Sequence, residues 1–125
     1  MKFVSAFTLA LALSVSLLSG SARADGDAAK GAKVFNKCKS CHGVDEGGKH
    51  KIGPNLFGVF GRAVAATDFS KYEALSADDG VWDEDTLDKW LENPKKFNGK
   101  KTKMTLKLKK EDDRENVIAY LMTLK

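Results

Sequence analysis

The feature that most constrains this chain of 125 residues is the pentapeptide Cys38-Lys39-Ser40-Cys41-His42. Two thiols at this spacing can lie on one face of a single helical turn, and the histidine projects from the same turn. Cys38 and Cys41 can then form thioether bonds to the two vinyl groups of one haem, while the imidazole of His42 binds the iron from one side. C-x-x-C-H is the attachment motif of c-type haem. We therefore predict one covalently attached haem c.

Two other uses of this cysteine pair deserve comparison. A redox-active disulfide of the thioredoxin kind is expected in a βαβ context, for which the sequence gives no sign. A structural zinc site needs four ligands, and the chain has no second Cys/His pair of suitable spacing. A thiol–disulfide oxidoreductase therefore stays as the alternative if no haem is attached.

The N-terminus predicts export from the cytoplasm. Lys2 precedes an apolar run over residues 3–18, and the small residues of 19–24 fit an A-x-A cleavage site. We predict that residues 1–24 are a secretory signal peptide cleaved after Ala24, and that residues 25–125 form a single domain in the periplasm. An uncleaved membrane anchor is the alternative, but the apolar run is shorter than the roughly 20 residues that a span requires.

The distribution of charge is more informative than the formal net charge of +4. Residues 68–92 hold nine acidic residues and two lysines, whereas residues 93–110 hold eight lysines and no acidic residue. This separation predicts a strong dipole with one basic face, which suits acidic protein partners and gives no reason to expect a nucleic-acid partner.

Helical patterns stand at both ends of the predicted domain. Asp27 is a suitable N-cap for a first helix reaching about Lys39. The last helix is expected to begin at Lys110 or Glu111, with acidic residues in its first turn. Its apolar stripe consists of Val117, Ile118, Leu121 and Leu124.

The middle of the chain is mostly loop. Glycines punctuate residues 43–61, and a long irregular segment in a small domain usually has a function or wraps around something. Residues 62–80 are also irregular, with one short helix expected near 72–75. Asp83 or Asp85 caps a further helix that ends at Asn93, because Pro94 disfavours helical geometry in the residue before it. With no convincing strand pattern, the predicted class is all-α with long loops.

The iron needs a ligand on the face opposite His42. His50 follows too soon in the sequence to reach that face, and Met122 lies in the last helix, where a packing role explains it. Met104 lies in the lysine-rich loop, far enough along the chain to close over the other face. We predict Met104 as the second axial ligand, and a thioether opposite an imidazole raises the reduction potential.

Taken together, these motifs resemble the class I cytochromes c, which include mitochondrial cytochrome c and the periplasmic cytochrome c2 group. The resemblance covers nearly all of residues 25–125. The matching runs are Lys30-Gly31 with Phe35, CKSCH at 38–42, GGKHKIGPNL at 47–56, GVFGR at 58–62, Trp82 with Thr86-Leu87, LENPKKF at 91–97, Thr102-Lys103-Met104 and IAYL at 118–121. It implies the class I cytochrome c fold, in which the N- and C-terminal helices cross and a third helix and long loops wrap around one haem.

The resemblance also implies roles for single residues around that haem. Cys38 and Cys41 carry the thioethers, and His42 and Met104 are the axial ligands. The remaining contacts would come from the Pro54 carbonyl, which accepts from the other nitrogen of His42, from Arg62, Tyr72 and Trp82 at the propionates, and from Thr102 near Met104.

Three further positions follow from the same resemblance. Gly31 and Phe35 would pack against Tyr120 where the terminal helices cross, and His50 would brace its loop. The sequence departs from the family at Trp90, where relatives often have a tyrosine near the methionine ligand. The segment between Tyr72 and Trp82 is also shorter than in mitochondrial relatives.

The function implied is that of a soluble, monomeric one-electron carrier rather than an enzyme, because both axial positions are filled by the protein. The resemblance implies a bc1-type complex as donor and a photosynthetic reaction centre or terminal oxidase as acceptor, with only transient association at the membrane surface. Exposed lysines would steer the carrier toward acidic docking surfaces. The alternative is a peroxidase-like or ligand-binding haem protein with an open iron site.

Overall fold

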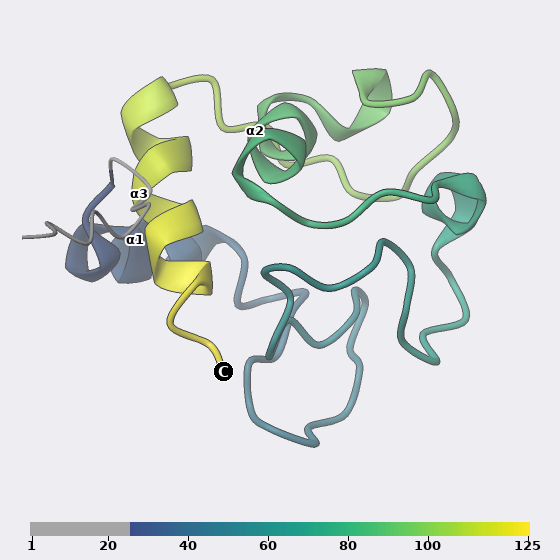
Figure 1. Cartoon of the computed structure of the whole chain (residues 1–125), viewed down its shortest axis with the longest axis horizontal. Helices are drawn as coiled ribbons and strands as arrows, with labels where there is room; N and C mark the ends of the chain where they lie inside the picture. The colour runs from purple at the N-terminus through teal and green to yellow at the C-terminus, as the bar shows by residue number, and fades with distance from the viewer. Residues whose placement is uncertain (1–25) are drawn as a thin grey trace, which may run out of the picture.

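The computed structural model describes residues 26–125, apart from the side chains of Ala74 and Ala77. The predicted signal peptide therefore lies outside the described residues. Three α-helices are joined by long loops (Figure 1): α1 (Ala28–Val34), α2 (Glu84–Glu92) and α3 (Glu111–Leu121). Three short 3-10 helices complete the list: η1 (Phe35–Lys37), η2 (Glu73–Ala77) and η3 (Pro94–Lys96). None of the helices in this part of the chain is long and apolar enough to cross a membrane.

The expected helix boundaries agree with the structure except at the end of the first helix. Asp27 caps α1 by accepting from Lys30 N, and Asp83, rather than Asp85, caps α2 by accepting from Thr86 N. We expected the first helix to reach about Lys39, but α1 ends at Val34 and the chain tightens into η1. The reason is a change in hydrogen bonding, since Cys38 N donates to the Phe35 carbonyl three residues back, as in a 3-10 turn.

Helices α1 and α3 cross in close contact, with α1 lying behind α3 in Figure 1. A Cβ at Gly31 would lie 1.9 Å from the Asn116 carbonyl oxygen, so only glycine fits there. The Asn116 side chain accepts from Asp27 N at 2.8 Å. Phe35 is almost fully buried against Tyr120, with ring centroids 5.1 Å apart. The contacts expected for Gly31 and Phe35 at this crossing are confirmed.

The rest of the core lies where α2, α3 and the loops pack together. Buried residues from α2, α3 and the loops form one continuous cluster, including Leu75, Trp82, Leu87, Trp90, Leu91, Leu108, Val117, Ile118 and Leu121. Of the expected stripe on the last helix, Val117, Ile118 and Leu121 are buried and Leu124 is partly buried. An isolated antiparallel bridge joins Ala63 to Val81, and residues 26–125 contain no strand.

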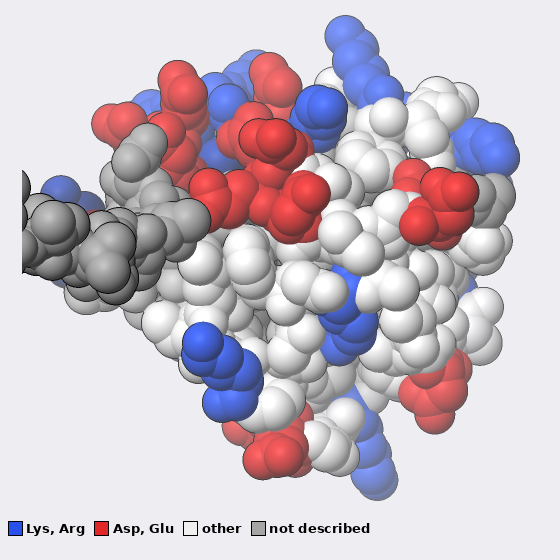
Figure 2. Space-filling view, in the orientation of Figure 1, with Lys and Arg blue, Asp and Glu red and all other residues white. Residues whose placement is uncertain are grey.

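Charged residues separate on the surface as the sequence predicts. Figure 2 shows acidic side chains gathered over the start of α3 and beside α2. A groove there is lined by Glu84, Asp85, Asp88, Lys89, Glu111, Glu115 and Ile118. The lysines of the loop that follows α2 are exposed to solvent.

Candidate haem site

The cysteine pair and the histidine lie on one hydrogen-bonded turn. Cys41 N and His42 N both donate to the Cys38 carbonyl, at 3.1 and 3.0 Å. Both thiols are free, with Cys38 buried and Cys41 partly exposed. Burial, and secondarily the neighbouring Cys41, raises the pKa of Cys38 to about 11. The Cys38 thiol is therefore not activated as a nucleophile in this environment.

The ring of His42 is held in the form that binds a metal. Its Nδ1 lies 2.7 Å from the Pro54 carbonyl oxygen, which is the contact that the family resemblance implies. A carbonyl oxygen can only accept, so Nδ1 carries the hydrogen and the lone pair of Nε2 is left free. Burial lowers the pKa of His42, and the bond to Pro54 partly opposes this shift. The neutral imidazole is therefore favoured, which is the state that ligates iron.

Gly53 makes room for this ring. A Cβ at Gly53 would lie 2.4 to 2.9 Å from Cε1, Nδ1 and Nε2 of His42. Gly53 N donates to the Cys41 carbonyl at 2.8 Å, and Leu56 N donates to the Gly43 carbonyl at 2.8 Å. The Gly-rich loop is thus fastened directly onto the attachment turn.

Two adjoining cavities bring together every residue that the sequence analysis assigned to the site. A cavity of about 300 Å³ is lined by Cys38, Cys41, His42 and Met104, among others. A second cavity of about 100 Å³ is lined by Pro54, Arg62, Tyr72, Trp82, Thr102 and again Met104. The two share Ile52, Gly53, Lys103 and Met104, so they form one slot between the attachment turn and the lysine-rich loop.

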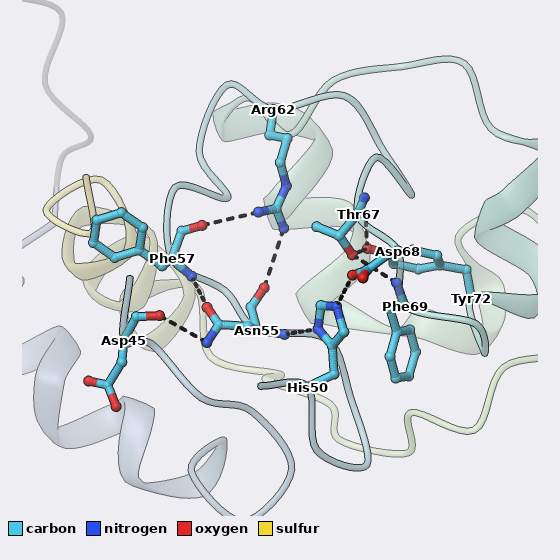
Figure 3. Close-up of polar contacts among 9 residues, drawn as sticks. All are labelled: Asp45, His50, Asn55, Phe57, Arg62, Thr67, Asp68, Phe69 and Tyr72. Atoms are coloured by element: carbon cyan, nitrogen blue, oxygen red, sulfur yellow. Dashed lines mark hydrogen bonds and ion pairs between the residues drawn. The ribbon is translucent and has the colours of Figure 1, made fainter. Parts of the chain in front are cut away.

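Arg62 provides a direct test of whether a carboxylate-bearing porphyrin fits this slot. Its Nη1 donates to the Phe57 carbonyl at 3.0 Å and its Nη2 to the Asn55 carbonyl at 3.5 Å (Figure 3). Its Nε is buried and has no hydrogen-bond partner among the protein groups described. A buried, unpaired donor on a cation is costly unless an anion meets it, and a haem propionate would satisfy it.

The loop segments that carry Arg62 and Trp82 are held together by the backbone. Trp82 N donates to the Arg62 carbonyl at 2.9 Å, and Gly61 N to the Trp82 carbonyl at 2.8 Å. The Trp82 ring packs against Trp90 and Phe97 in an aromatic cluster. Trp90 thus forms an apolar wall of the slot, which Met104 also lines.

Tyr72 and Thr102 make local contacts within the protein. The Tyr72 hydroxyl is hydrogen-bonded to the Thr67 hydroxyl and accepts from Thr67 N (Figure 3). Thr102 Oγ1 accepts from Met104 N at 3.2 Å, which fixes the backbone at the methionine. Each side chain lines the slot while bracing the segment that carries it.

Sequence reasoning missed the residues that anchor the far end of the Met104 loop. Leu108 N donates to the Leu91 carbonyl at 2.8 Å. The buried Arg114 donates to the carbonyls of Leu108 and Lys109, and its Nε lies 2.6 Å from Asp88 of α2. An arginine and an aspartate on separate helices carry no spacing signal, so only the fold shows that they meet.

His50 braces the glycine-rich loop instead of facing the slot. Its Nδ1 accepts from Asn55 N at 2.9 Å, so its Nε2 carries the hydrogen that it donates to Asp68 at 2.6 Å (Figure 3). This hydrogen bond lowers the pKa of Asp68. Asn55 in turn donates to the Asp45 carbonyl and accepts from Phe57 N, and the loop is held from several sides.

A CxxCH turn with a free imidazole nitrogen, opening onto a slot closed by a second candidate ligand, defines a c-type haem protein. Comparison with known proteins agrees with this class. The family model described as cytochrome c matches residues 28–125. Cytochrome c2 of Rhodospirillum rubrum is 47% identical over 122 residues, which cover 89% of this chain and 90% of the relative.

Two further relatives come from other bacteria. Cytochrome c-550 of Novispirillum itersonii is 44% identical over 80% of this chain and 100% of its own length. Cytochrome c-554 of Methylosinus trichosporium is 43% identical over 97% of this chain and 92% of its own length. The chain therefore belongs to the cytochrome c family. It is an electron-transfer protein with one covalent haem c and the all-α fold of class I, as predicted.

Proposed function

We propose that this protein is a periplasmic carrier that shuttles single electrons between membrane redox complexes, with His42 and Met104 as the axial ligands of its haem. The observation that carries the proposal is the slot itself, since His42 and Met104 line the same cavity and the Nε2 lone pair of His42 is free. When bound, the haem supplies the one-electron change between ferric and ferrous iron. With His42 and Met104 both bound, the iron would have no open position for a substrate.

The surrounding residues have separate tasks in this proposal. Cys38 and Cys41 hold the haem covalently, and the Pro54 carbonyl fixes the ring orientation and basicity of His42. Arg62 would meet a propionate with its unpaired Nε, and Tyr72 and Trp82, which line the same cavity, would contact the propionates as well. Thr102 keeps Met104 in place through the methionine N–H.

The proposed ligation by Met104 is tested by removing its sulfur, which would leave one coordination position of the iron open. Met104→Ala should allow the reduced protein to bind carbon monoxide at neutral pH, whereas the wild type should not. The ferric wild type should also show the weak near-infrared absorption of sulfur bound to iron. Met122→Ala is the matched control, because Met122 follows α3 and packs against the core. Ready binding of carbon monoxide by the wild type would favour a ligand-binding haem protein instead.

Electrostatic steering accounts for how the carrier would find its partners. Lys37 beside the attachment turn and Lys103 beside Met104 line the same cavity, and both are exposed. Further exposed lysines near these segments are Lys33, Lys39, Lys95, Lys96, Lys100, Lys101 and Lys107. Acidic side chains gather elsewhere, over α2 and α3 (Figure 2). The basic face at the slot suits acidic docking surfaces, such as those expected on a bc1-type complex, a reaction centre or a terminal oxidase.

Steering predicts a dependence on salt. Raising the ionic strength should slow second-order electron transfer to such a complex, because screening shortens the reach of the lysines to about 10 Å at 0.1 M. Stopped-flow kinetics over a range of salt concentrations measures this effect. A rate constant that does not change with salt would contradict steering while leaving the haem ligation untouched.

The periplasmic location depends on the predicted signal peptide. Export is expected to remove residues 1–24, so that the mature protein begins at Asp25. N-terminal sequencing of the protein purified from the periplasm tests this prediction. Recovery in the membrane fraction with an intact N-terminus would instead support an uncleaved anchor.

A further inference from the structure

The lysine-rich loop contains an Asn-Gly pair, Asn98-Gly99. Both residues are exposed and neither lines the haem slot, so their accessibility does not depend on the cofactor. The carboxamide of an asparagine can react with the peptide nitrogen that follows it, and glycine offers that nitrogen with no side chain to block the approach. The four other asparagines each precede a residue with a side chain: Asn36, Asn55, Asn93 and Asn116.

The backbone at Gly99 leaves this nitrogen open to reaction. Its φ is +71°, which glycine adopts without strain, and a Cβ at this position would meet nothing within 4 Å. Among residues 26–125, no acceptor is hydrogen-bonded to the Gly99 N–H. The nitrogen can therefore lose its proton to a base from solvent and attack a neighbouring carbon.

The side chain of Asn98 is held over the same peptide. Lys100 N donates to Asn98 Oδ1 at 3.1 Å, so the carboxamide folds back across Gly99. Oδ1 is the atom on which negative charge develops when a nitrogen adds to Cγ, and a backbone N–H aimed at it stabilises that charge. A positive potential also favours loss of the Gly99 proton. It comes from exposed lysines on either side: Lys95, Lys96, Lys100 and Lys101.

We propose that Asn98 is a site of spontaneous deamidation that ages the basic face of the carrier. The Gly99 nitrogen forms a bond to Asn98 Cγ, and the bond from Cγ to the amide nitrogen breaks, so that ammonia leaves and a cyclic imide remains. Water then opens the ring at either carbonyl and gives aspartate or isoaspartate. The overall reaction consumes one water, releases one ammonia, and needs neither an oxidant nor a reductant.

The product places a carboxylate in a run that otherwise has none. Residues 93–110 contain eight lysines and no acidic residue, so one new negative charge there weakens the positive potential of the loop. This consequence rests on the proposed function, because the charge matters only if the lysines steer the carrier. Older protein molecules would then reach their partners more slowly, with the haem ligation unchanged.

The test incubates the intact haem protein in mildly alkaline buffer and follows each asparagine by peptide mapping with mass spectrometry. Deamidation exchanges NH for O, which shifts the mass, and adds a negative charge that ion-exchange chromatography resolves. Asn36 is the internal control, because it is exposed but precedes Lys37 within η1. Asn98→Gln is the matched variant, since glutamine keeps the amide but cannot form the same small ring.

Asn98 is expected to deamidate at least about tenfold faster than Asn36, because the reacting atoms are brought together at Asn98 and not in η1. Asn98→Gln should produce no new acidic form over the same period. Asn98→Asp carries the charge of the product. It should exchange electrons with a bc1-type complex about twofold more slowly than Asn98→Gln at low salt, and the two variants should converge at high salt.

Two results would overturn the assignment of the site. One is a rate at Asn98 no greater than that at Asn36. The other is an Asn98→Gln protein that becomes acidic as fast as the wild type, since the reaction would then lie elsewhere.

The consequence for steering is judged separately. Equal electron-transfer rates for Asn98→Asp and Asn98→Gln, beside a wild type that slows with salt, would refute the ageing of the basic face while the proposed function stands. A wild-type rate that does not respond to salt would remove steering itself, and the mass spectra would still decide whether Asn98 deamidates.

Discussion

At the scale of single residues, Gly53 sets how closely the backbone approaches the ring of His42. The imidazole ring is also hydrogen-bonded to the Pro54 carbonyl, so it cannot move away from residue 53 without losing that hydrogen bond. A methyl group at position 53 therefore acts on the candidate ligand more than on the rest of the fold.

Gly53→Ala should displace His42 and destabilise the haem protein by about 2 kcal/mol, the usual cost of overfilling a packed site. The reduction potential should shift as well, because the orientation and basicity of the imidazole change. Thermal unfolding and a redox titration measure the two effects. Gly47→Ala is the control, because its added methyl meets nothing within 4 Å and reports only the cost of a positive φ. Equal reduction potentials for the two variants would show that a side chain at position 53 does not affect His42.

The bond between His50 and Asp68 provides a residue-scale prediction that depends on pH. It lowers the pKa of Asp68 below its ordinary value, so the carboxylate form stabilises the folded protein. This contribution is present at neutral pH and is lost as the pH falls below about 4, through the native pKa.

Asp68→Asn should therefore lower the melting temperature slightly at pH 7, and the difference should shrink as the pH falls through the native pKa of Asp68, which lies below its ordinary value. Asp68 is almost fully exposed, so the effect is small. Melting curves of the haem protein over a series of decreasing pH values test it. A difference that stays constant over the whole series would mean that the charge of Asp68 does not matter.

At the scale of elements, the crossing of α1 and α3 reverses the usual rule for glycine in a helix. Alanine is normally favoured over glycine inside a helix by about 1 kcal/mol. At Gly31 an added methyl would collide with the Asn116 carbonyl and with Tyr120 Cβ, both of which belong to the facing helix.

Gly31→Ala should thus destabilise the protein by about 3 kcal/mol despite the gain in helix propensity. Ala29→Gly, at an exposed position of the same helix, should cost about 1 kcal/mol from propensity alone. Denaturant unfolding of both variants compares them. Stabilisation by Gly31→Ala would contradict the close crossing.

The elements also show where prediction from sequence succeeds. Asp27, Asp83 and Pro94 are local signals, so the starts of α1 and α2 and the end of α2 could be read from the residues beside them. The early end of α1 could not be predicted, because no local sequence signal distinguishes an α-helical turn from the 3-10 turn that begins at Phe35. The hydrogen-bond partners of His50 and Arg114 could not be predicted from the sequence either. Their bonds to Asp68 and Asp88 depend on how the loops and helices pack in the folded protein.

At the scale of the whole molecule, the core is arranged around the haem slot. Leu75, Trp82 and Trp90 belong to the buried cluster and also line the slot, so the protein core and the cofactor site are one structure. A domain of about 100 residues buries little surface by itself. Much of the apolar contact in this one must come from the porphyrin.

A chain with Cys38→Ser and Cys41→Ser, which cannot retain the haem covalently, should lose its cooperative unfolding transition and much of its helical signal. Loss of the cofactor removes the binding free energy that favours the folded state. Circular dichroism in the far and near ultraviolet, compared with the haem protein in the same buffer, checks this outcome. A sharp melting transition with native near-ultraviolet signals would show that the polypeptide folds unaided.

The fastening of the Gly-rich loop onto the attachment turn has a consequence for maturation. Cys41, His42, Gly53 and Pro54 are close neighbours in the chain, and their mutual contacts close only a short loop. Met104 must return from a much more distant part of the sequence, and closing a longer loop is slower. If His42 and Met104 are the ligands, as proposed, local contacts assemble the thiols and His42 while the C-terminal half of the chain is still unstructured, and Met104 joins the site last.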